Sequence, residues 1–378
     1  MRIGVDARVL LGSLTGIGRY TSELSKKLTQ YPDTKFSFYT PSCPPIEVTK
    51  NLKPGIIKSS NSHNRLSKMV WSQTELPYWA SRDQVDLFWG PTHRLPRYLP
   101  KSIARVVTIH DLVWRYAPKT MRPPSLWMEK ILMPQAIDLA DLVIASSKST
   151  ASGIAEVFPQ HVQKVRVVHL GVTTLPSPSN ASALSTLEIT KPYFLFVGTL
   201  EPRKNLDRLL SAFALVPQLY RDKFTLAIAG GKGWGGIDVE KLVSKNGLQD
   251  SVKLLGYVTE QQLAVLYANA QFLAMPSIYE GFGLPLVEAM QFGTPVLTSD
   301  VGSMAEIAGD AGVLVDPLSI ESIAKAIVSL LGDDDLKQSL RANALRQVQK
   351  FSWEKCAIET MAVFEEATEI RDFRISRY

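Results

Sequence analysis

Two glutamates in the stretch PSIYEGFGLPLVE, residues 276–288, have the type and spacing best suited to binding chemistry in this chain. Glu280 and Glu288 are separated by seven residues, and Gly281 and Gly283 lie between them. A carboxylate can accept two hydrogen bonds from a vicinal diol. Glycines allow close approach of the backbone, and the free amides at a helix N-terminus attract an anion such as a diphosphate. The stretch therefore predicts a ligand site for hydroxyls beside phosphate.

A strand before this stretch and a helix after it must hold the site in place. Residues 271–275 form a short apolar run typical of a buried parallel strand, and residues 286–292 carry apolar side chains at helical spacing. Pro285 suits only the first turn of a helix, so the helix is expected to begin near Gly283 or Leu284. Glu280 then lies on the loop and Glu288 about one turn inside the helix. An acidic helix start that faces solvent is the alternative interpretation.

Two cations follow another expected strand, Tyr193–Thr199, and precede a helix that extends to about Leu215. Arg203 and Lys204 lie where an open α/β sheet switches from strand to helix, which is where such sheets bind ligands. Arginine and lysine at that point can hold phosphate oxygens. Two solvated surface charges are the other interpretation.

The first half of the chain shows the same organisation. The strand Ile3–Asp6 leads to Gly16-Ile-Gly18 and a helical pattern, as in a phosphate-binding loop of a nucleotide fold. A later strand ends in His110 and Asp111, so both polar side chains are expected at the carboxyl edge of the sheet. Asp111 is expected either to orient the imidazole of His110 or to cap the next helix.

The motif Glu280 to Glu288, together with GTLEPRKN at residues 198–205, resembles the retaining GT-B glycosyltransferases of family 4. The resemblance implies that Glu280 contacts the transferred sugar, that Glu288 holds the ribose, and that His110 lies close to the donor sugar. It also implies that Arg203 and Lys204 bind the donor diphosphate, which makes His110, Glu280, Arg203 and Lys204 the expected catalytic residues. The other expected donor-binding residues are Gly16, Gly18, Thr199, Tyr257, Val258, Gly281, Phe282, Gly283 and Leu284.

A chain of 378 residues is too long for one ordinary core, so two domains are expected. Short apolar runs at 35–39, 85–89, 105–109, 142–146 and 165–169 suit a doubly wound parallel sheet. The resemblance implies an α/β GT-B fold in which two Rossmann-like domains face a central cleft. The acceptor-binding domain is expected at 1–174, a linker at 175–190 and the nucleotide-sugar domain at 191–352. A terminal helix, 353–372, is expected to pack back on the first domain.

The charge is unevenly placed along the chain. Residues 1–170 hold 23 Lys and Arg against 12 Asp and Glu, whereas the remainder holds 19 against 24. A basic first half suits anionic partners, either phosphates or an anionic membrane surface, unless the charges are simply solvated. The basic and aromatic segments 58–82 and 121–130 are interpreted either as surfaces that touch an acceptor or membrane, or as core aromatics beside solvated charges. No nucleic-acid-binding motif is present, so nucleic acid is not an expected partner.

The sequence gives no indication of a metal site. It has no Asp-x-Asp motif, Asp333–Asp335 suits a capping turn, and Cys43 and Cys356 are expected to be free thiols. The start of the chain resembles a strand rather than a signal peptide, which predicts a cytoplasmic protein, with a peripheral position at the inner membrane face left open.

The resemblance implies transfer of a hexose to a glycan or lipid-linked saccharide acceptor. The segments GIGRY and IHDLVW resemble those of mannosyltransferases, which implies mannose from GDP-mannose. The family resemblance also implies a front-face displacement without a protein nucleophile. UDP-sugar donors of glucose or N-acetylglucosamine, and a rhamnose donor, remain alternatives. A nucleotide-sugar 2-epimerase, a phosphorylase and a non-catalytic sugar-nucleotide binder also remain, whereas a serine hydrolase lacks its Gly-x-Ser-x-Gly elbow.

Overall fold

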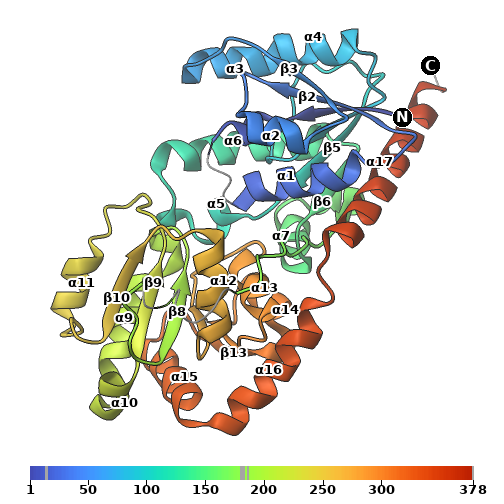
Figure 1. The fold of residues 1–378 in the computed structure, drawn as a ribbon. Helices are drawn as coiled ribbons and strands as arrows, with labels where there is room; N and C mark the ends of the chain where they lie inside the picture. Colours follow the sequence, from blue (N-terminus) through green and yellow to red (C-terminus); the bar gives the residue numbers. More distant parts are fainter. Residues whose placement is uncertain (13–15, 179–183, 185–186, 377–378) are drawn as a thin grey trace. The chain divides into compact units, whose positions relative to one another are not determined.

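Short apolar and β-branched runs form the strands of two separate parallel sheets in a computed structural model of the chain (Figure 1). The structure describes residues 1–12, 16–178, 184 and 187–376. The chain divides into two units, each with its own sheet. Unit 1 comprises Met1–Leu112, Pro124–Gly171 and Ser352–Tyr378, and unit 2 comprises Val113–Pro123 and Val172–Phe351. Residues 179–183 and 185–186 of the expected linker lie outside the described residues.

Unit 1 is built on a seven-stranded sheet with the order β3-β2-β1-β4-β5-β6-β7, in which all neighbouring strands pair in parallel. The order reverses between β1 and β4, as in a doubly wound nucleotide fold. Its strands are β1 Arg2–Asp6, β2 Lys35–Thr40, β3 Ile56–Ser59, β4 Leu87–Gly90, β5 Ala104–Ile109, β6 Leu142–Ala145 and β7 Val165–Val167. Its helices are η1 Arg8–Leu11, α1 Gly16–Leu28, α2 Ile46–Asn51, α3 Arg65–Gln73, α4 Glu75–Arg82, α6 Pro123–Leu139, α7 Lys148–Val157, η3 Pro159–Lys164 and α17 Trp353–Ile375.

The strand β3 was not predicted, because this short edge strand lacks a buried apolar run. The segment 58–82 forms the end of β3 followed by α3 and α4. Its Trp71 is buried in the core, as the interpretation of core aromatics predicts, whereas Leu66, Met69 and Val70 of α3 are exposed. None of the described helices is long and apolar enough to cross a bilayer.

Unit 2 has a six-stranded parallel sheet with the order β10-β9-β8-β11-β12-β13, again reversing beside its first strand. Its strands are β8 Tyr193–Val197, β9 Thr225–Ala229, β10 Val252–Gly256, β11 Leu273–Met275, β12 Val296–Ser299 and β13 Gly312–Val315. Its helices are α5 Val113–Tyr116, η2 Pro118–Thr120, η4 Pro202–Lys204, α9 Leu206–Leu215, α10 Gln218–Lys223, α11 Val239–Lys245, α12 Glu260–Asn269, α13 Leu284–Gln291, α14 Met304–Ala308, η5 Gly309–Ala311, α15 Ile320–Gly332 and α16 Asp334–Val348.

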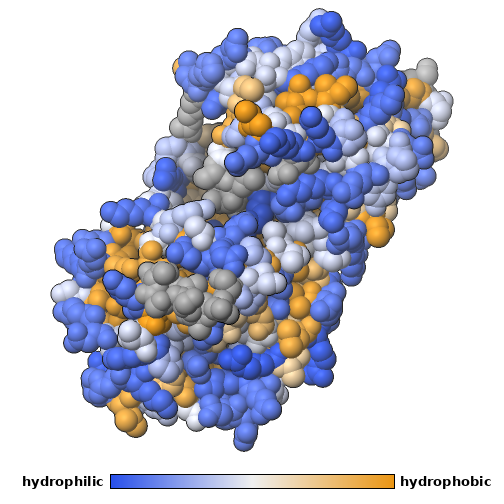
Figure 2. Space-filling view, viewed as in Figure 1, coloured by the Kyte–Doolittle hydropathy of each residue, from blue (hydrophilic) through white to orange (hydrophobic). Residues whose placement is uncertain are grey.

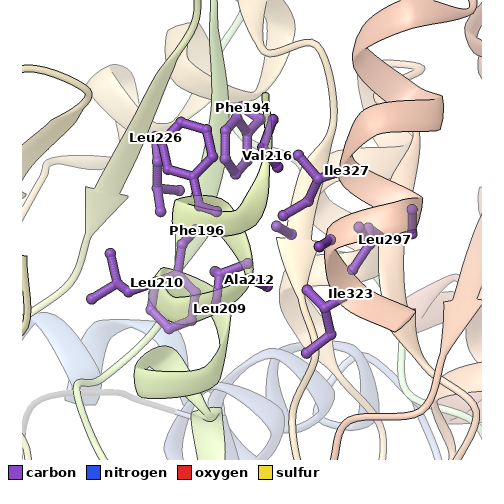
Figure 3. Packing of buried hydrophobic residues seen from close by; sticks show 14 of the residues in the cluster. Phe194, Phe196, Leu209, Leu210, Ala212, Val216, Leu226, Leu297, Ile323 and Ile327 are labelled. Atoms are coloured by element: carbon purple, nitrogen blue, oxygen red, sulfur yellow. The ribbon is translucent and has the colours of Figure 1, made fainter. Parts of the chain in front are cut away.

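The core of unit 2 fixes where its first strand ends. Figure 3 shows Phe194 and Phe196 of β8 pointing toward residues of α9 and α15, among them Leu209 and Ile323. All four side chains are fully buried. Because β8 is anchored by large apolar side chains, the loop that follows it starts from a rigid base, as a binding loop requires.

Asp333 caps α16 by accepting a hydrogen bond from the amide of Leu336, as the sequence predicted. Figure 2 shows a largely hydrophilic surface interrupted by apolar patches on both units. Scattered exposed apolar side chains are normal on folded proteins, so these patches by themselves do not define a site.

Candidate functional site

The loops that follow β8 and β11 bring three predicted residues together in unit 2. Lys204 Nζ donates to Glu280 Oε1 at 2.7 Å, and Arg203 Nη1 donates to Glu280 Oε2. The second guanidinium nitrogen of Arg203 donates to Glu201 Oε1 at 2.7 Å. β8 and β11 are neighbours at the point where the strand order reverses, so their carboxyl ends deliver both loops to one place.

The electrostatics of this cluster keep Glu280 ionised. Burial by itself would raise the pKa of the Glu280 carboxyl, but the charges and hydrogen bonds of Arg203 and Lys204 outweigh burial and lower the pKa to about 2. At neutral pH the side chain is therefore a hydrogen-bond acceptor and not a proton donor. The two cations in turn have a carboxylate where the sequence predicted a diphosphate.

Backbone contacts hold the Glu280 loop in this position. Ser303 donates to the Glu280 carbonyl from its hydroxyl at 3.1 Å and from its amide at 3.2 Å. Gly302 has a φ of +63°, and a Cβ there would lie 2.8 Å from the same carbonyl oxygen, so no larger residue fits without a shift. Neither residue was predicted, although the pair GS at 302–303, shortly after the apolar strand β12, is a turn signal.

Asn205 joins the two loops. It adopts a left-handed conformation with a φ of +61°, which asparagine tolerates better than most residues. Its side-chain nitrogen Nδ2 donates to the carbonyl of Pro276 at 2.8 Å and to that of Pro317 at 2.7 Å. The residue directly after Lys204 thus ties the β8 loop to the end of β11.

The second glutamate lies in the helix, as predicted. α13 begins at Leu284, and Gly283 precedes it with a φ of +93°. Glu288 is buried, and its Oε2 accepts a hydrogen bond from the phenol of Tyr267 at 3.0 Å. Tyr267 belongs to α12 and is fully buried. Tyr267 was not predicted as a site residue, because an aromatic residue in a helix usually indicates core packing.

The other predicted donor-binding residues of unit 2 lie around the same sheet edge. Gly281 and Phe282 are buried beside Gly283, Leu284 is partly buried and Thr199 is exposed. Tyr257 and Val258 follow β10, which is an edge strand of the sheet. The strands β9 and β8 lie between β10 and β11. Tyr257 is 86% exposed, so its ring is available for stacking.

His110 lies in unit 1, directly after β5, and is buried. Its Nε2 lies 2.9 Å from the carbonyl oxygen of Pro91, which can only accept, so Nε2 carries the proton. The rings of Tyr20 and His110 pack edge to face, with their centroids 4.6 Å apart. Burial, followed by the charge of His93, lowers the pKa of His110 to about 3. The imidazole is therefore neutral, and Nδ1 is its acceptor atom. The carbonyl of Pro91 orients the ring from its Nε2 side.

The two predicted glycines of unit 1 lie in a helix rather than in a loop. Gly16 is the first residue of α1, with a φ of +31°, and Gly18 is buried in the first turn. The position of Gly-x-Gly between a strand and a helix predicts a loop, but the first turn of a helix also tolerates glycine. Residues 13–15, which precede the helix, lie outside the described residues. Among the described residues, no cluster of His, Cys, Asp and Glu is placed to hold a metal ion.

Comparison with known proteins gives the context of this geometry. Residues 14–174 match the model of Glycosyltransferase Family 4, and residues 183–347 match that of Glycosyl transferases group 1. The chain is 32% identical to O-antigen chain mannosyltransferase B of Escherichia coli, in an alignment that covers 93% of this chain and 96% of the relative.

The fold is shared with solved structures of much lower identity. Sucrose-phosphate synthase of Thermosynechococcus elongatus superposes with a TM-score of 0.76 at 22% identity, over 97% of this chain and 98% of the other. HepE of Anabaena, solved with UDP and glucose, gives 0.72 at 18% identity, over 97% and 99%. Both sheets are parallel and doubly wound, and the similarity to the Escherichia coli mannosyltransferase extends over nearly the whole of both chains. This chain therefore belongs to the GT-B glycosyltransferases of group 1 and family 4.

Proposed function

We propose that this enzyme transfers mannose from GDP-mannose to a glycan or lipid-linked saccharide acceptor in the synthesis of a cell-surface polysaccharide or glycolipid, with retention of the anomeric configuration. The observation that carries the choice of sugar is the full-length similarity to a protein named as an O-antigen chain mannosyltransferase. The transfer itself is supported by the clustered cations and carboxylate after β8 and β11.

In this proposal the donor diphosphate replaces Glu280 as the partner of Arg203 and Lys204. Both cations lie within hydrogen-bond reach of a carboxylate, whose oxygens resemble those of a phosphate in charge and geometry. They stabilise the negative charge that grows on the departing nucleotide, and the positive end of the α13 dipole adds to this effect. Glu280 then turns its ionised oxygens to hydroxyls of the transferred sugar.

Retention is explained by a front-face displacement. The bond between the anomeric carbon and the phosphate oxygen breaks while the acceptor oxygen bonds to the same face of that carbon. The proton of the acceptor hydroxyl passes to the departing phosphate oxygen. Glu280 is an ion-paired carboxylate and acts by hydrogen bonding, while the neutral His110 accepts a hydrogen bond from a sugar hydroxyl at Nδ1.

The test is a screen of purified sugar nucleotides for binding and slow hydrolysis. GDP-mannose should be preferred over UDP-glucose, UDP-N-acetylglucosamine and a nucleotide-linked rhamnose. A clear preference for a UDP-sugar would overturn mannose while leaving the transferase intact. Analysis of the recovered sugar by NMR separates the remaining classes, because an epimerase returns an altered sugar and a pure binder returns the donor unchanged.

Turnover should not require a metal ion, because Arg203 and Lys204 supply the positive charge that a divalent cation would otherwise bring to the diphosphate. Activity should persist in EDTA. If chelation abolished turnover and Mg²⁺ or Mn²⁺ restored it, the assignment of these two residues to the diphosphate would be wrong.

Peripheral contact with an anionic membrane, from the cytoplasmic side, belongs to the same proposal. It is supported by the excess of basic residues in the first half of the chain and by the exposed Leu66, Met69 and Val70 of α3. Cosedimentation with vesicles rich in an anionic lipid should exceed that with neutral vesicles and should fall as salt is raised.

A further inference from the structure

The connection between β4 and β5 holds His110 at two points. The carbonyl of Pro91 accepts the Nε2 proton of the His110 ring, and Nε2 of His93 accepts a hydrogen bond from the His110 amide at 2.9 Å. The His93 amide in turn donates to the carbonyl of Thr108 at 3.1 Å. Two residues of this connection, Pro91 and His93, thus fix the ring and the backbone of the histidine that follows β5.

The hydrogen bond to the amide sets the tautomer of His93. Because Nε2 accepts, the proton of a neutral His93 ring is on Nδ1, and Nδ1 lies 3.3 Å from Glu129 Oε2. Glu129 belongs to α6 and is also held by Arg94, whose Nη2 lies 3.3 Å from Oε1. A chain of contacts therefore runs from Glu129 through His93 to the amide of His110.

The backbone of His93 is unusual in the same place. Its φ is +61°, in the left-handed region that residues other than glycine seldom adopt, and its side chain is buried. Such a conformation is unfavourable for a residue with a Cβ and persists only where surrounding contacts impose it. Here it brings the ring within 5.4 Å of the His110 ring, measured between centroids.

We propose that His93 is a positioning residue for the transfer reaction: as a neutral ring oriented by Glu129, it fixes His110 so that Nδ1 of that histidine meets the donor sugar. This inference rests on the proposed function, which assigns His110 to the sugar. It goes beyond that function by naming a second histidine and a glutamate that act without touching the substrate.

The charged groups around His93 make its role dependent on pH. Burial lowers the pKa of His93, but Glu129 and Asp111 outweigh burial and the charge of Arg94, so that the pKa is raised. Protonation places an N–H at Nε2, directly against the N–H of His110, and removes the acceptor. As the pH falls through the raised pKa of His93, the positioning of His110 is lost, and turnover should fall with it.

Two substitutions of His93 separate the hydrogen bond from the shape of the side chain. His93→Phe keeps a planar ring but has no acceptor, whereas the side-chain oxygen of His93→Gln can reach the same amide without titrating. The phenylalanine variant should lose roughly 10-fold or more in kcat with little change in the KM for the donor, as expected when a transition-state contact is lost. The glutamine variant should recover most of that loss and show no acidic fall in rate. Equal activity of the two variants, or an unchanged acidic limb in His93→Gln, would overturn the proposal.

Glu129→Gln provides a test that leaves the strained residue in place. The amide oxygen still accepts from Nδ1 of His93, but the negative charge is gone. The acidic limb of the pH–turnover profile should therefore move to lower pH, because the Glu129 carboxylate stabilises the protonated His93 ring. A limb at the same pH as in the wild type would show that His93 is not the titrating group.

A spectroscopic readout separates this inference from the proposed function. In the free protein, ¹⁵N-edited NMR of the histidine rings should show His110 with its proton on Nε2 in the wild type and in His93→Gln, and an altered signal in His93→Phe. An unaltered signal in His93→Phe would contradict the positioning role whatever the donor proves to be. Full turnover of His110→Ala would instead refute the assignment of His110 to the sugar, and the inference with it.

Discussion

Glu280 has two opposite roles at the residue scale, one in the free protein and one proposed for the complex. In the free protein it neutralises Arg203 and Lys204, two cations that would otherwise be held close together and largely buried. Like charges held close together repel each other, so the carboxylate of Glu280 helps to keep Arg203 and Lys204 side by side, while Glu201 also pairs with Arg203. The donor must then replace Glu280.

Replacing either glutamate with alanine should separate their roles. Glu280→Ala removes the competitor of the diphosphate, so GDP should bind this variant at least as tightly as the wild type, while turnover should fall on the order of 100-fold. Glu288→Ala should weaken GDP binding about 10-fold, because that residue is assigned to the ribose. Calorimetric titration of both variants with GDP is the measurement. Equal losses of affinity, or the reverse order, would mean that the roles are exchanged or that neither residue touches the donor.

Tyr267 should matter for nucleotide binding although it lies in the core of unit 2. Its phenol is a donor to a buried carboxylate, and a hydrogen bond to a charged group contributes about 1.5–3 kcal/mol. Tyr267→Phe should therefore leave Glu288 poorly oriented and weaken GDP binding roughly 10-fold. Tyr193→Phe is the matched control, since that buried phenol donates only to the backbone carbonyl of Leu266. If both variants bound GDP equally, Glu288 would not depend on Tyr267.

At the scale of the elements, the site depends on turns that follow two neighbouring strands. The turn after β11 leads through Gly283 into α13, and this glycine has a φ of +93°. A Cβ at this position would meet Met304 Sδ at 3.3 Å and side-chain carbons of Leu286 and Met275 at 3.4 Å. The left-handed conformation favours glycine where the helix begins, and the neighbouring side chains would have to move slightly to accept a Cβ.

Gly283→Ala should destabilise unit 2 by about 1–2 kcal/mol, the typical cost of a left-handed conformation for a residue with a Cβ. Gly231→Ala is the control, because that glycine has no heavy atom near the added Cβ and no positive φ. Its effect should stay within about 0.5 kcal/mol. Urea unfolding, followed by hydrogen exchange in the strands of unit 2, measures both. A neutral result for Gly283→Ala would show that the turn relaxes without strain.

At the scale of the whole molecule, the chain returns to unit 1 after completing unit 2. α17 buries Phe364 against Trp89 of β4, with ring centroids 5.7 Å apart. Near the end of the helix, Arg374 pairs with Asp141 at 2.5 Å, and Arg371 donates to the carbonyl of Asp86 at 2.8 Å. Unit 1 therefore cannot complete its core until the last helix has been made.

Phe364→Ala should destabilise unit 1 by about 3–5 kcal/mol, the usual cost of removing a fully buried aromatic ring. Because Phe364 packs within unit 1, protection from hydrogen exchange should fall in β1 to β7 and remain in β8 to β13. Ile358→Ala on the same helix is the control, since that side chain is 62% exposed. Equal loss of protection in both units would indicate that they unfold as one cooperative body.

The alternation of strands and helices, and the residues that lie in the turns between them, could be predicted from the sequence alone. Apolar runs between turn signals fix β8 and β11, and Pro285 after Gly283 fixes the start of α13, because these preferences are local. The position of Glu280 on a loop and of Glu288 inside a helix followed directly. The short edge strand β3 was missed because its pattern is not apolar, and Gly18 was misplaced because glycine is compatible with both a loop and a first helical turn.

The pairing of polar side chains in the site could be seen only in the tertiary structure. That Arg203 and Lys204 pair with Glu280 depends on the order of the strands, which places β8 beside β11 although about 75 residues separate them in sequence. The contacts of Tyr267 with Glu288 and of His93 with His110 likewise join residues whose own neighbours carry no signal of them. Local sequence encodes secondary structure through backbone preferences, whereas the partners of a buried polar side chain follow from how the elements pack, because burial requires that each polar group find a partner within reach.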